Sequence, residues 1–201
     1  KFVDYLIADK VVIPNDKKKY YSENIIYLPY SYQPNDNTKI ISDKKFLRSE
    51  MNLPENSFIF CCFNDSYKIS EVEFSIWMRL LKNVEGSILW LLDTNRWARD
   101  NLKKEAKKRG IEPQRIVFAK KIKISDHLSR IRFADLFLDT FNYNAHTTAS
   151  DALWAGLPIL TKIGSSFSAR VASSLLYAMD IPELVTKNQH DYERLALSLA
   201  K

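Results

Sequence analysis

One short stretch, residues 142–158 (NYNAHTTASDALWAGLP), carries side chains with clear potential for chemistry. The imidazole of His146 comes directly before the hydroxyls of Thr147 and Thr148, where the sequence predicts the start of a helix. The first turn of a helix offers unpaired backbone N–H groups and the positive end of the helix dipole, and these side chains add further donors. This combination is suited to binding an anionic phosphate.

The same stretch also has a purely structural interpretation, which the sequence leaves open. Thr147 or Thr148 is a natural N-cap for a helix that ends at Gly156. His146 is then an ordinary loop residue on the surface. Asp151 lies one turn inside the predicted helix, where it could accept a hydrogen bond from a ribose hydroxyl or merely stabilise the helix dipole.

Two further segments place polar side chains where a buried strand gives way to a helix. The run FCCFNDSYKIS leaves Asn64, Asp65 and Lys68 just after an apolar strand. The run KKIKISDHLSRIRFAD puts His127 and Arg130 three residues apart, on one face of a short helix, and we expect both at an exposed edge of the ligand cleft. An arginine there could meet a phosphate or a base carbonyl, although a solvated lysine and a helix-surface pair give the same sequence pattern.

Short apolar runs alternate with amphipathic stretches from residue 57 onward, and this alternation predicts the elements that position these side chains. Each run is short, rich in β-branched or aromatic residues and bounded by polar residues, as buried strands are. We expect an α/β fold, a parallel sheet with helices on both faces, whose ligand site lies at the carboxyl ends of the strands. The predicted strands are 57–63, 87–92, 115–119, 135–140, 157–161 and 183–186.

The first part of the chain lacks this alternation of apolar and amphipathic segments, which predicts a boundary between two structural units near residue 56. Residues 1–56 contain two strand or loop pieces, several prolines and a polar connector that includes a short helix. We interpret 1–56 as the end of one unit and the linker into the next. Residues 57–201 then form the ligand-binding unit.

Composition narrows the class of protein. The net charge of +6 is scattered rather than gathered in one basic block, which argues against a nucleic-acid partner. The adjacent Cys61 and Cys62 lie in an apolar run, as reduced core cysteines of a cytoplasmic protein do. No apolar run approaches the roughly 18 residues that cross a bilayer, so no membrane association is expected. There is no D-x-D triplet, the three histidines lack metal-ligand spacing, and four glycines provide no glycine-rich phosphate loop.

Long blocks of the sequence resemble a known family. FCCFNDSYKI, WMRLLKNVEGSILWLL, RIVFA, ADLFLDTFNYNAHTTASDALWAGLPILT and SARVASSLLYAMDIPELV occur in this order. Together they are similar to the C-terminal catalytic lobe of the O-linked N-acetylglucosamine transferase family, which includes the SPINDLY-type proteins. The likeness covers nearly the whole chain.

The resemblance implies a Rossmann-like lobe of a GT-B glycosyltransferase that is inverting and needs no metal or other cofactor. The expected reaction transfers N-acetylglucosamine from UDP-GlcNAc to Ser or Thr hydroxyls of acceptor proteins. Lys68 matches the lysine that stabilises the diphosphate leaving group. The resemblance places His127 and Arg130 beside the uracil, His146, Thr147 and Thr148 at the phosphates, and Asp151 at the ribose. Asn64 and Asp65, at the end of a predicted strand, are further candidate donor-binding residues.

Two departures keep alternatives open. The family's animal members have Gln where this chain has Asp65 and Lys where it has Ile124. The same fold with another donor, such as GDP-fucose in SPINDLY-type members, therefore stays an alternative, as does a non-catalytic nucleotide-binding or interaction module. The resemblance also implies that the rest of the N-terminal lobe and tetratricopeptide repeats lie outside this chain. We expect the chain alone to be inactive, with the catalytic base supplied by the donor phosphate or by that other lobe.

Overall fold

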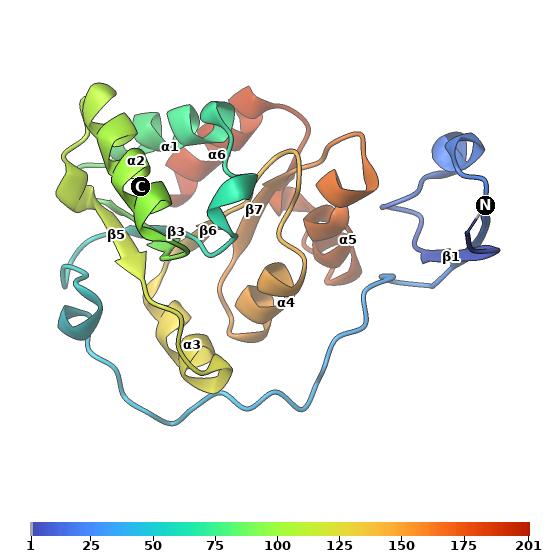
Figure 1. The fold of residues 1–201 in the computed structure, drawn as a ribbon, viewed down its shortest axis with the longest axis horizontal. Coiled ribbons are helices and arrows are strands. Elements are labelled where there is room, and N and C mark those ends of the chain that lie inside the picture. The colour runs from blue at the N-terminus through green and yellow to red at the C-terminus, as the bar shows by residue number, and fades with distance from the viewer. Residues whose placement is uncertain (1) are drawn as a thin grey trace.

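A six-stranded parallel sheet forms the centre of the molecule (Figure 1). The computed structural model describes residues 2–201. The strands lie side by side in the order β5-β4-β3-β6-β7-β8, and every neighbouring pair is parallel. All six predicted strands are confirmed. Their bounds are β3 Ile59–Cys62, β4 Ile88–Leu92, β5 Ile116–Ala119, β6 Leu136–Leu138, β7 Ile159–Lys162 and β8 Val185–Thr186.

Six helices cover the two faces of this sheet. Helices α1 and α6 pack against each other, whereas α4 contacts both α3 and α5, and Figure 1 shows these two groups on opposite sides of the strands. This arrangement confirms the predicted parallel sheet with helices on both faces. The bounds are α1 Glu71–Asn83, α2 Arg96–Lys108, α3 Ile124–Arg130, α4 Thr147–Trp154, α5 Val171–Ala178 and α6 Gln189–Leu199.

The core explains why the strands are apolar throughout rather than alternating. All four residues of β3 and all three of β6 are buried, because helices cover both faces of the sheet. Trp77 of α1 and Trp90 of β4 are completely buried in the same cluster. Cys61 and Cys62 are buried, unpaired thiols, as the sequence predicts.

Residues before the main sheet form a second, smaller sheet and a long connector (residues 28–58) that leads to β3. Strands β1 (Tyr5–Ala8) and β2 (Asn24–Tyr27) pair in parallel, and a small apolar cluster that includes Val171 packs them against α5. From there the chain runs past α5, α4 and α3 to reach β3 (Figure 1). The division at residue 56 stays a prediction.

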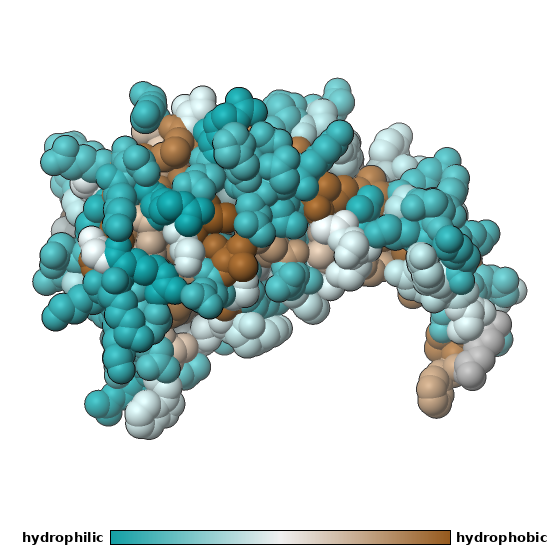
Figure 2. All heavy atoms as spheres, turned by 90° about the horizontal axis from the view of Figure 1, so that it is seen from above, coloured by the Kyte–Doolittle hydropathy of each residue, from teal (hydrophilic) through white to brown (hydrophobic). Residues whose placement is uncertain are grey.

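The surface is mostly hydrophilic, with apolar side chains at the end formed by β1 and β2 (Figure 2). Tyr5, Ile7 and Ile26 of the small sheet are all exposed. Between Phe2 and Lys201, no helix is long and apolar enough to cross a membrane.

Candidate functional site

The loop between β6 and α4 is fixed from beneath by Asp139, which is completely buried at the end of β6. Its carboxylate accepts hydrogen bonds from the backbone N–H groups of Thr140 (2.8 Å) and Ala145 (2.6 Å) and from the Thr161 hydroxyl (2.6 Å). Burial raises the pKa of Asp139 to about 7, while these hydrogen bonds and the nearby Lys68 act in the opposite direction. The loop therefore holds one shape as it enters α4.

Helix α4 begins differently from the sequence prediction. The N-cap position is His146, and neither Thr147 nor Thr148 caps the helix. Instead, the Thr148 hydroxyl donates to Asn64 Oδ1 (2.7 Å), so it ties α4 to the end of β3. The predicted threonine N-cap is wrong, because this side-chain partner on a neighbouring strand takes the hydroxyl. The exposed Thr147 is left at the first turn of the helix.

The segment after β3 contains the other half of this polar cluster. Asn64 is buried, and its Nδ2 donates to the Thr140 hydroxyl (2.8 Å). Asn64 thus joins β3, the loop after β6 and α4. Asp65 begins the short 3₁₀ turn Ser66–Lys68 and is exposed, so its carboxylate is not part of this buried network.

Lys68 lies over the loop between β6 and α4. Its Nζ donates to the carbonyl of Asn144 (3.1 Å) and lies 3.9 Å from the ring centroid of Tyr143. Burial lowers the pKa of Lys68, while Asp139 acts in the opposite direction. On the same ring, His146 stacks with a centroid separation of 4.7 Å and an interplanar angle of 21°. The structure thus brings Lys68 and His146 together through Tyr143.

His146 has a second fixed contact. Its Nε2 lies 3.3 Å from the carbonyl oxygen of Ser168, in the loop after β7, and donates to it. Burial is the largest cause that lowers the pKa of His146. Burial thus favours the neutral form of this ring, near the first turn of α4.

The pair on α3 is positioned otherwise than predicted. We expected His127 and Arg130 at an exposed edge, but Arg130 is buried, with 3% of its surface exposed. Its Nη2 donates to the Lys120 carbonyl (2.6 Å) and its Nε donates to His127 Nδ1 (3.2 Å). The prediction of an exposed Arg130 is wrong, because the backbone before α3 supplies an acceptor that a sequence does not reveal.

His127 is neutral in this arrangement. Burial and the neighbouring Arg130 lower the pKa of His127 to about 4, and burial lowers the pKa of Arg130 to about 10. Because Nδ1 accepts from Arg130, the imidazole proton is on Nε2, which remains a donor. The ring also meets Phe63, next to Asn64, edge to face at 5.0 Å. This contact places α3 beside the end of β3.

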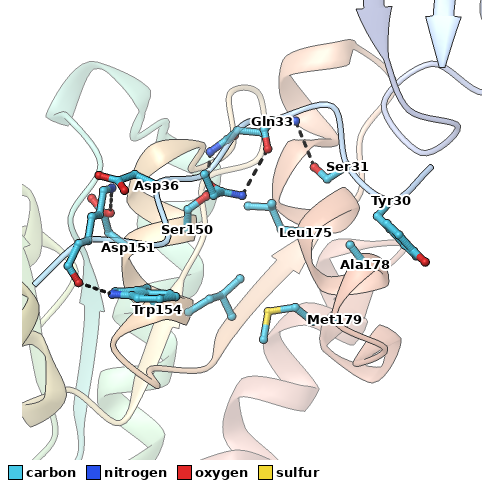
Figure 3. A pocket seen from close by; sticks show the side chains of 13 residues that line it. Tyr30, Ser31, Gln33, Asp36, Ser150, Asp151, Trp154, Leu175, Ala178 and Met179 are labelled. Atoms are coloured by element: carbon cyan, nitrogen blue, oxygen red, sulfur yellow. Dashed lines mark hydrogen bonds and ion pairs between the residues drawn. The ribbon is translucent and has the colours of Figure 1, made fainter. Parts of the chain in front are cut away.

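Asp151 faces the connector rather than open solvent. Its carboxylate forms an ion pair with Lys39 of the connector. Two hydrogen bonds also hold the connector on α4. Gln33 Nε2 donates to the Ser150 hydroxyl (2.8 Å), and Trp154 Nε1 donates to the Lys39 carbonyl (3.1 Å). These contacts border a cavity of about 410 Å³ between the connector, α4 and α5 (Figure 3). Leu153, Leu175 and Met179 are among the apolar residues that line it.

A second cavity, of about 400 Å³, lies at the first turn of α4. His146 and Thr147 line it together with the connector, and Lys39 lines both cavities. The phosphate and ribose positions predicted from the sequence thus border adjoining spaces. Within the described residues 2–201, no group of three or more His, Cys, Asp or Glu side chains could hold a metal ion.

Sequence reasoning missed two residues of this site. Tyr143 was only one aromatic in a loop, and Lys39 was one of many scattered lysines. The position of Tyr143 just ahead of the predicted helix start was the available signal, since loop residues at strand ends face the ligand edge of a parallel sheet. Nothing in the sequence links Lys39 to Asp151, which is 112 residues away.

The chain matches known proteins of one family along nearly its whole length. The family model described as glycosyl transferase family 41 matches residues 40–201. The Arabidopsis thaliana protein named "Probable UDP-N-acetylglucosamine--peptide N-acetylglucosaminyltransferase SEC" is 36% identical over 99% of this chain and 21% of its own length. The Caenorhabditis elegans UDP-N-acetylglucosamine--peptide N-acetylglucosaminyltransferase is 40% identical over 76% of this chain and 13% of its own length.

The fold agrees with these sequence relatives. A mutant of the Thermobaculum terrenum O-GlcNAc transferase superposes with a TM-score of 0.87 at 26% identity, covering 99% of this chain and 38% of that chain. This likeness confirms the predicted fold, the C-terminal lobe of a GT-B glycosyltransferase. The chain spans about a fifth of the length of the SEC relative. On these matches, the chain belongs to glycosyl transferase family 41.

Proposed function

We propose that this chain is the nucleotide-sugar-binding part of a protein O-glycosyltransferase that transfers N-acetylglucosamine, with inversion, from UDP-GlcNAc to Ser or Thr of acceptor proteins. The relatives carry names that state this donor and a peptide acceptor. The observation that carries the proposal is the position of Lys68, held by Asn144 and Tyr143 beside the loop that enters α4. A fixed cation next to a helix N-terminus is suited to a diphosphate.

Lys68 is the proposed catalytic residue. When the anomeric bond breaks, negative charge grows on the leaving diphosphate, and a fixed donor aimed at such charge contributes about 10²–10³ in rate. Within residues 2–201, the Asn144 carbonyl accepts from one of the three N–H donors of Lys68, and a donor that faces neither this carbonyl nor the Tyr143 ring can meet a phosphate oxygen. The first turn of α4 and the exposed Thr147 are further donors to the diphosphate in this proposal.

The nucleoside is held by the α3 pair and Asp151 in this proposal. The neutral His127 offers its Nε2 proton to a base carbonyl, and Arg130 keeps the imidazole in that tautomer. Asp151 accepts from a ribose hydroxyl once Lys39 releases it. Asn64 contributes by holding Thr148 through a hydrogen bond. The exposed Asp65 contacts the nucleotide sugar only at the edge of the site.

We propose further that Lys68 and the helix N-terminus, rather than a metal ion, neutralise the leaving group. Transfer that survives excess EDTA would support this, and loss of transfer that Mg²⁺ or Mn²⁺ restores would contradict it. The base that accepts the proton of the Ser or Thr hydroxyl is then the donor phosphate or a group outside this chain, because His127 and His146 are committed to the donor side.

The whole reaction requires more than this chain in our proposal. The chain covers 38% of the Thermobaculum terrenum structure, and a donor cleft of a GT-B enzyme needs a second lobe. We assign that lobe and tetratricopeptide repeats to the rest of the protein, and we assign the protein to the cytoplasm. The chain alone should bind UDP weakly and transfer nothing.

Calorimetric titration with UDP and with GDP tests the nucleotide assignment. Binding of UDP at least tenfold tighter than GDP supports the proposal. Preference for GDP would instead favour a GDP-fucose donor, and binding of neither would favour an interaction module. A transfer assay with UDP-GlcNAc and an acceptor protein, run on the full-length protein, then tests the reaction itself.

A further inference from the structure

Tyr143 is an exposed aromatic residue whose ring contacts two candidate site residues, Lys68 and His146. Its ring carries the Lys68 ammonium 3.9 Å from its centroid, and it stacks with the His146 imidazole at 4.7 Å. Both contacts use the π face, since the ammonium lies over the ring and the two rings are within 21° of parallel. One side chain thereby fixes two groups that come from different parts of the chain.

The exposure of Tyr143 argues against a role in the core. Tyr143 is 41% exposed and lies outside the buried apolar clusters of the described residues, and its neighbours in the loop are already fixed by Asp139 and the Asn144 side chain. What the ring does provide is a flat surface for a flexible lysine. A lysine side chain has many rotamers. A contact that excludes some of them keeps the ammonium at the diphosphate site for a larger fraction of the time.

We propose that Tyr143 is a positioning residue for the transferase reaction, holding Lys68 and His146 in place at the diphosphate site. The inference rests on the proposed function, because it assigns Tyr143 a part in the same site. The hydroxyl is not required for this role, since the ring face makes both contacts. The proposal therefore predicts that phenylalanine replaces tyrosine well and that leucine of similar apolar character does not.

Steady-state kinetics of the full-length protein with UDP-GlcNAc test this directly. Tyr143→Leu should lower kcat about tenfold, with a smaller change in the donor KM, whereas Tyr143→Phe should stay within about twofold of the starting protein. In a Lys68→Ala background, Tyr143→Leu should lower kcat clearly less than in the starting protein, because one of the two groups that it positions is gone. Equal losses in Tyr143→Phe and Tyr143→Leu, or full additivity with Lys68→Ala, would overturn the proposal.

Tyr20, near the N-terminus, is a matched control for Tyr143. Tyr20 is 75% exposed and also has a lysine, Lys19, over its ring at 5.3 Å, but its ring is in the 3₁₀ turn Asn15–Tyr20 and not in the loop between β6 and α4. Tyr20→Leu should leave kcat unchanged. Melting temperatures of all variants should agree within a few degrees, and a large drop for Tyr143→Leu alone would show a structural role instead.

An NMR measurement tests the stacking of Tyr143 on His146 independently of the proposed reaction. The stacked Tyr143 ring should shift the His146 ring protons upfield in the NMR spectrum of the ligand-free protein, in the starting chain and in Tyr143→Phe but not in Tyr143→Leu. If no variant transfers N-acetylglucosamine but this pattern holds, the reaction assignment fails and the stacking stands. If the shift is absent in the starting chain, the positioning role fails regardless of the reaction.

Discussion

His127 is held neutral at physiological pH by its surroundings. Burial and the adjacent Arg130 guanidinium lower the pKa of His127 to about 4, so the imidazole is uncharged from pH 6 upward. A neutral ring with its proton on Nε2 presents one fixed donor to a ligand. Its contribution to donor binding should therefore not vary between pH 6 and 8.

The same shift predicts how His127 affects stability. Unfolding restores a pKa near the ordinary value of about 6.5, so the unfolded chain binds more protons between pH 4 and 6.5 and stability rises with pH there. The contribution of His127 is fully present above about pH 6.5 and is lost as the pH falls toward 4. His127→Gln should thus show a smaller loss of unfolding free energy between pH 7.5 and 4.5 in urea titrations.

The exposed His190 supplies the control for this measurement. Its side chain is 85% exposed, so His190→Gln measures the effect of removing a histidine outside the core. Parallel pH profiles for His127→Gln and the starting protein would contradict the buried, neutral His127.

Residue types were predictable from the sequence, but their partners were not. The position of Lys68 after a buried strand follows from local pattern, because the end of a parallel strand is a ligand edge. The burial of Arg130 and the Lys39 ion pair with Asp151 depend on segments brought together by the fold. A single sequence has no local signal for such long-range pairs.

The connector acts on α4 through Lys39, whose ion pair with Asp151 competes with the proposed ribose contact. Asp151 is buried, with 8% of its surface exposed, and removal of Lys39 leaves its carboxylate without this partner, so Lys39→Ala should lower the melting temperature by several degrees. Asp151→Asn should weaken UDP binding about tenfold, because a charged acceptor for a ribose hydroxyl is lost. Calorimetric titration of both variants with UDP measures this.

The two variants also distinguish two roles for Asp151. If Asp151 binds ribose, Lys39→Ala should keep or improve UDP affinity while Asp151→Asn lowers it. Unchanged affinity in Asp151→Asn would show that the carboxylate serves only to fasten the connector.

The elements themselves were largely predictable. Six apolar runs became six strands because each is buried on both faces, a pattern that is visible without knowing the partners. The end of α4 was also readable, since Gly156 adopts a φ of +84° that favours glycine. The start of α4 was not, because Thr148 bonds to Asn64 from a distant strand instead of capping its own helix.

In the described residues 2–201, a buried carboxylate helps to join the two sheets. Asp9, 1% exposed, accepts from the backbone N–H groups of Val11 (2.8 Å), Val12 (2.9 Å) and Tyr32 (2.9 Å) and from the Ser174 hydroxyl (2.7 Å). It therefore connects the end of β1 with the connector and with α5. A minor apolar cluster and the Arg170 Nε, which donates to the Val11 carbonyl (2.5 Å), also fasten the small sheet.

Asp9→Asn should loosen the small sheet without unfolding the large one. The amide side chain turns two of the acceptor positions into donors that face other donors, which leaves buried groups unsatisfied. Amide hydrogen exchange should become at least tenfold faster in β1 and β2 and stay unchanged in β3 and β4. Asp43→Asn, at an exposed connector position, is the control. Faster exchange in all four strands would contradict this modular stability.

The proposed role of Lys68 in the departure of the diphosphate is tested most directly by the kinetics of Lys68→Ala in the full-length protein. The expected result is a fall in kcat for UDP-GlcNAc of about a hundredfold or more, with a much smaller change in the donor KM, because the lysine meets charge that appears only in the transition state. Lys68→Arg should rescue poorly, since a planar guanidinium directs its donors differently. Near-normal turnover in both variants would contradict the assignment of the diphosphate site to the loops that hold Lys68.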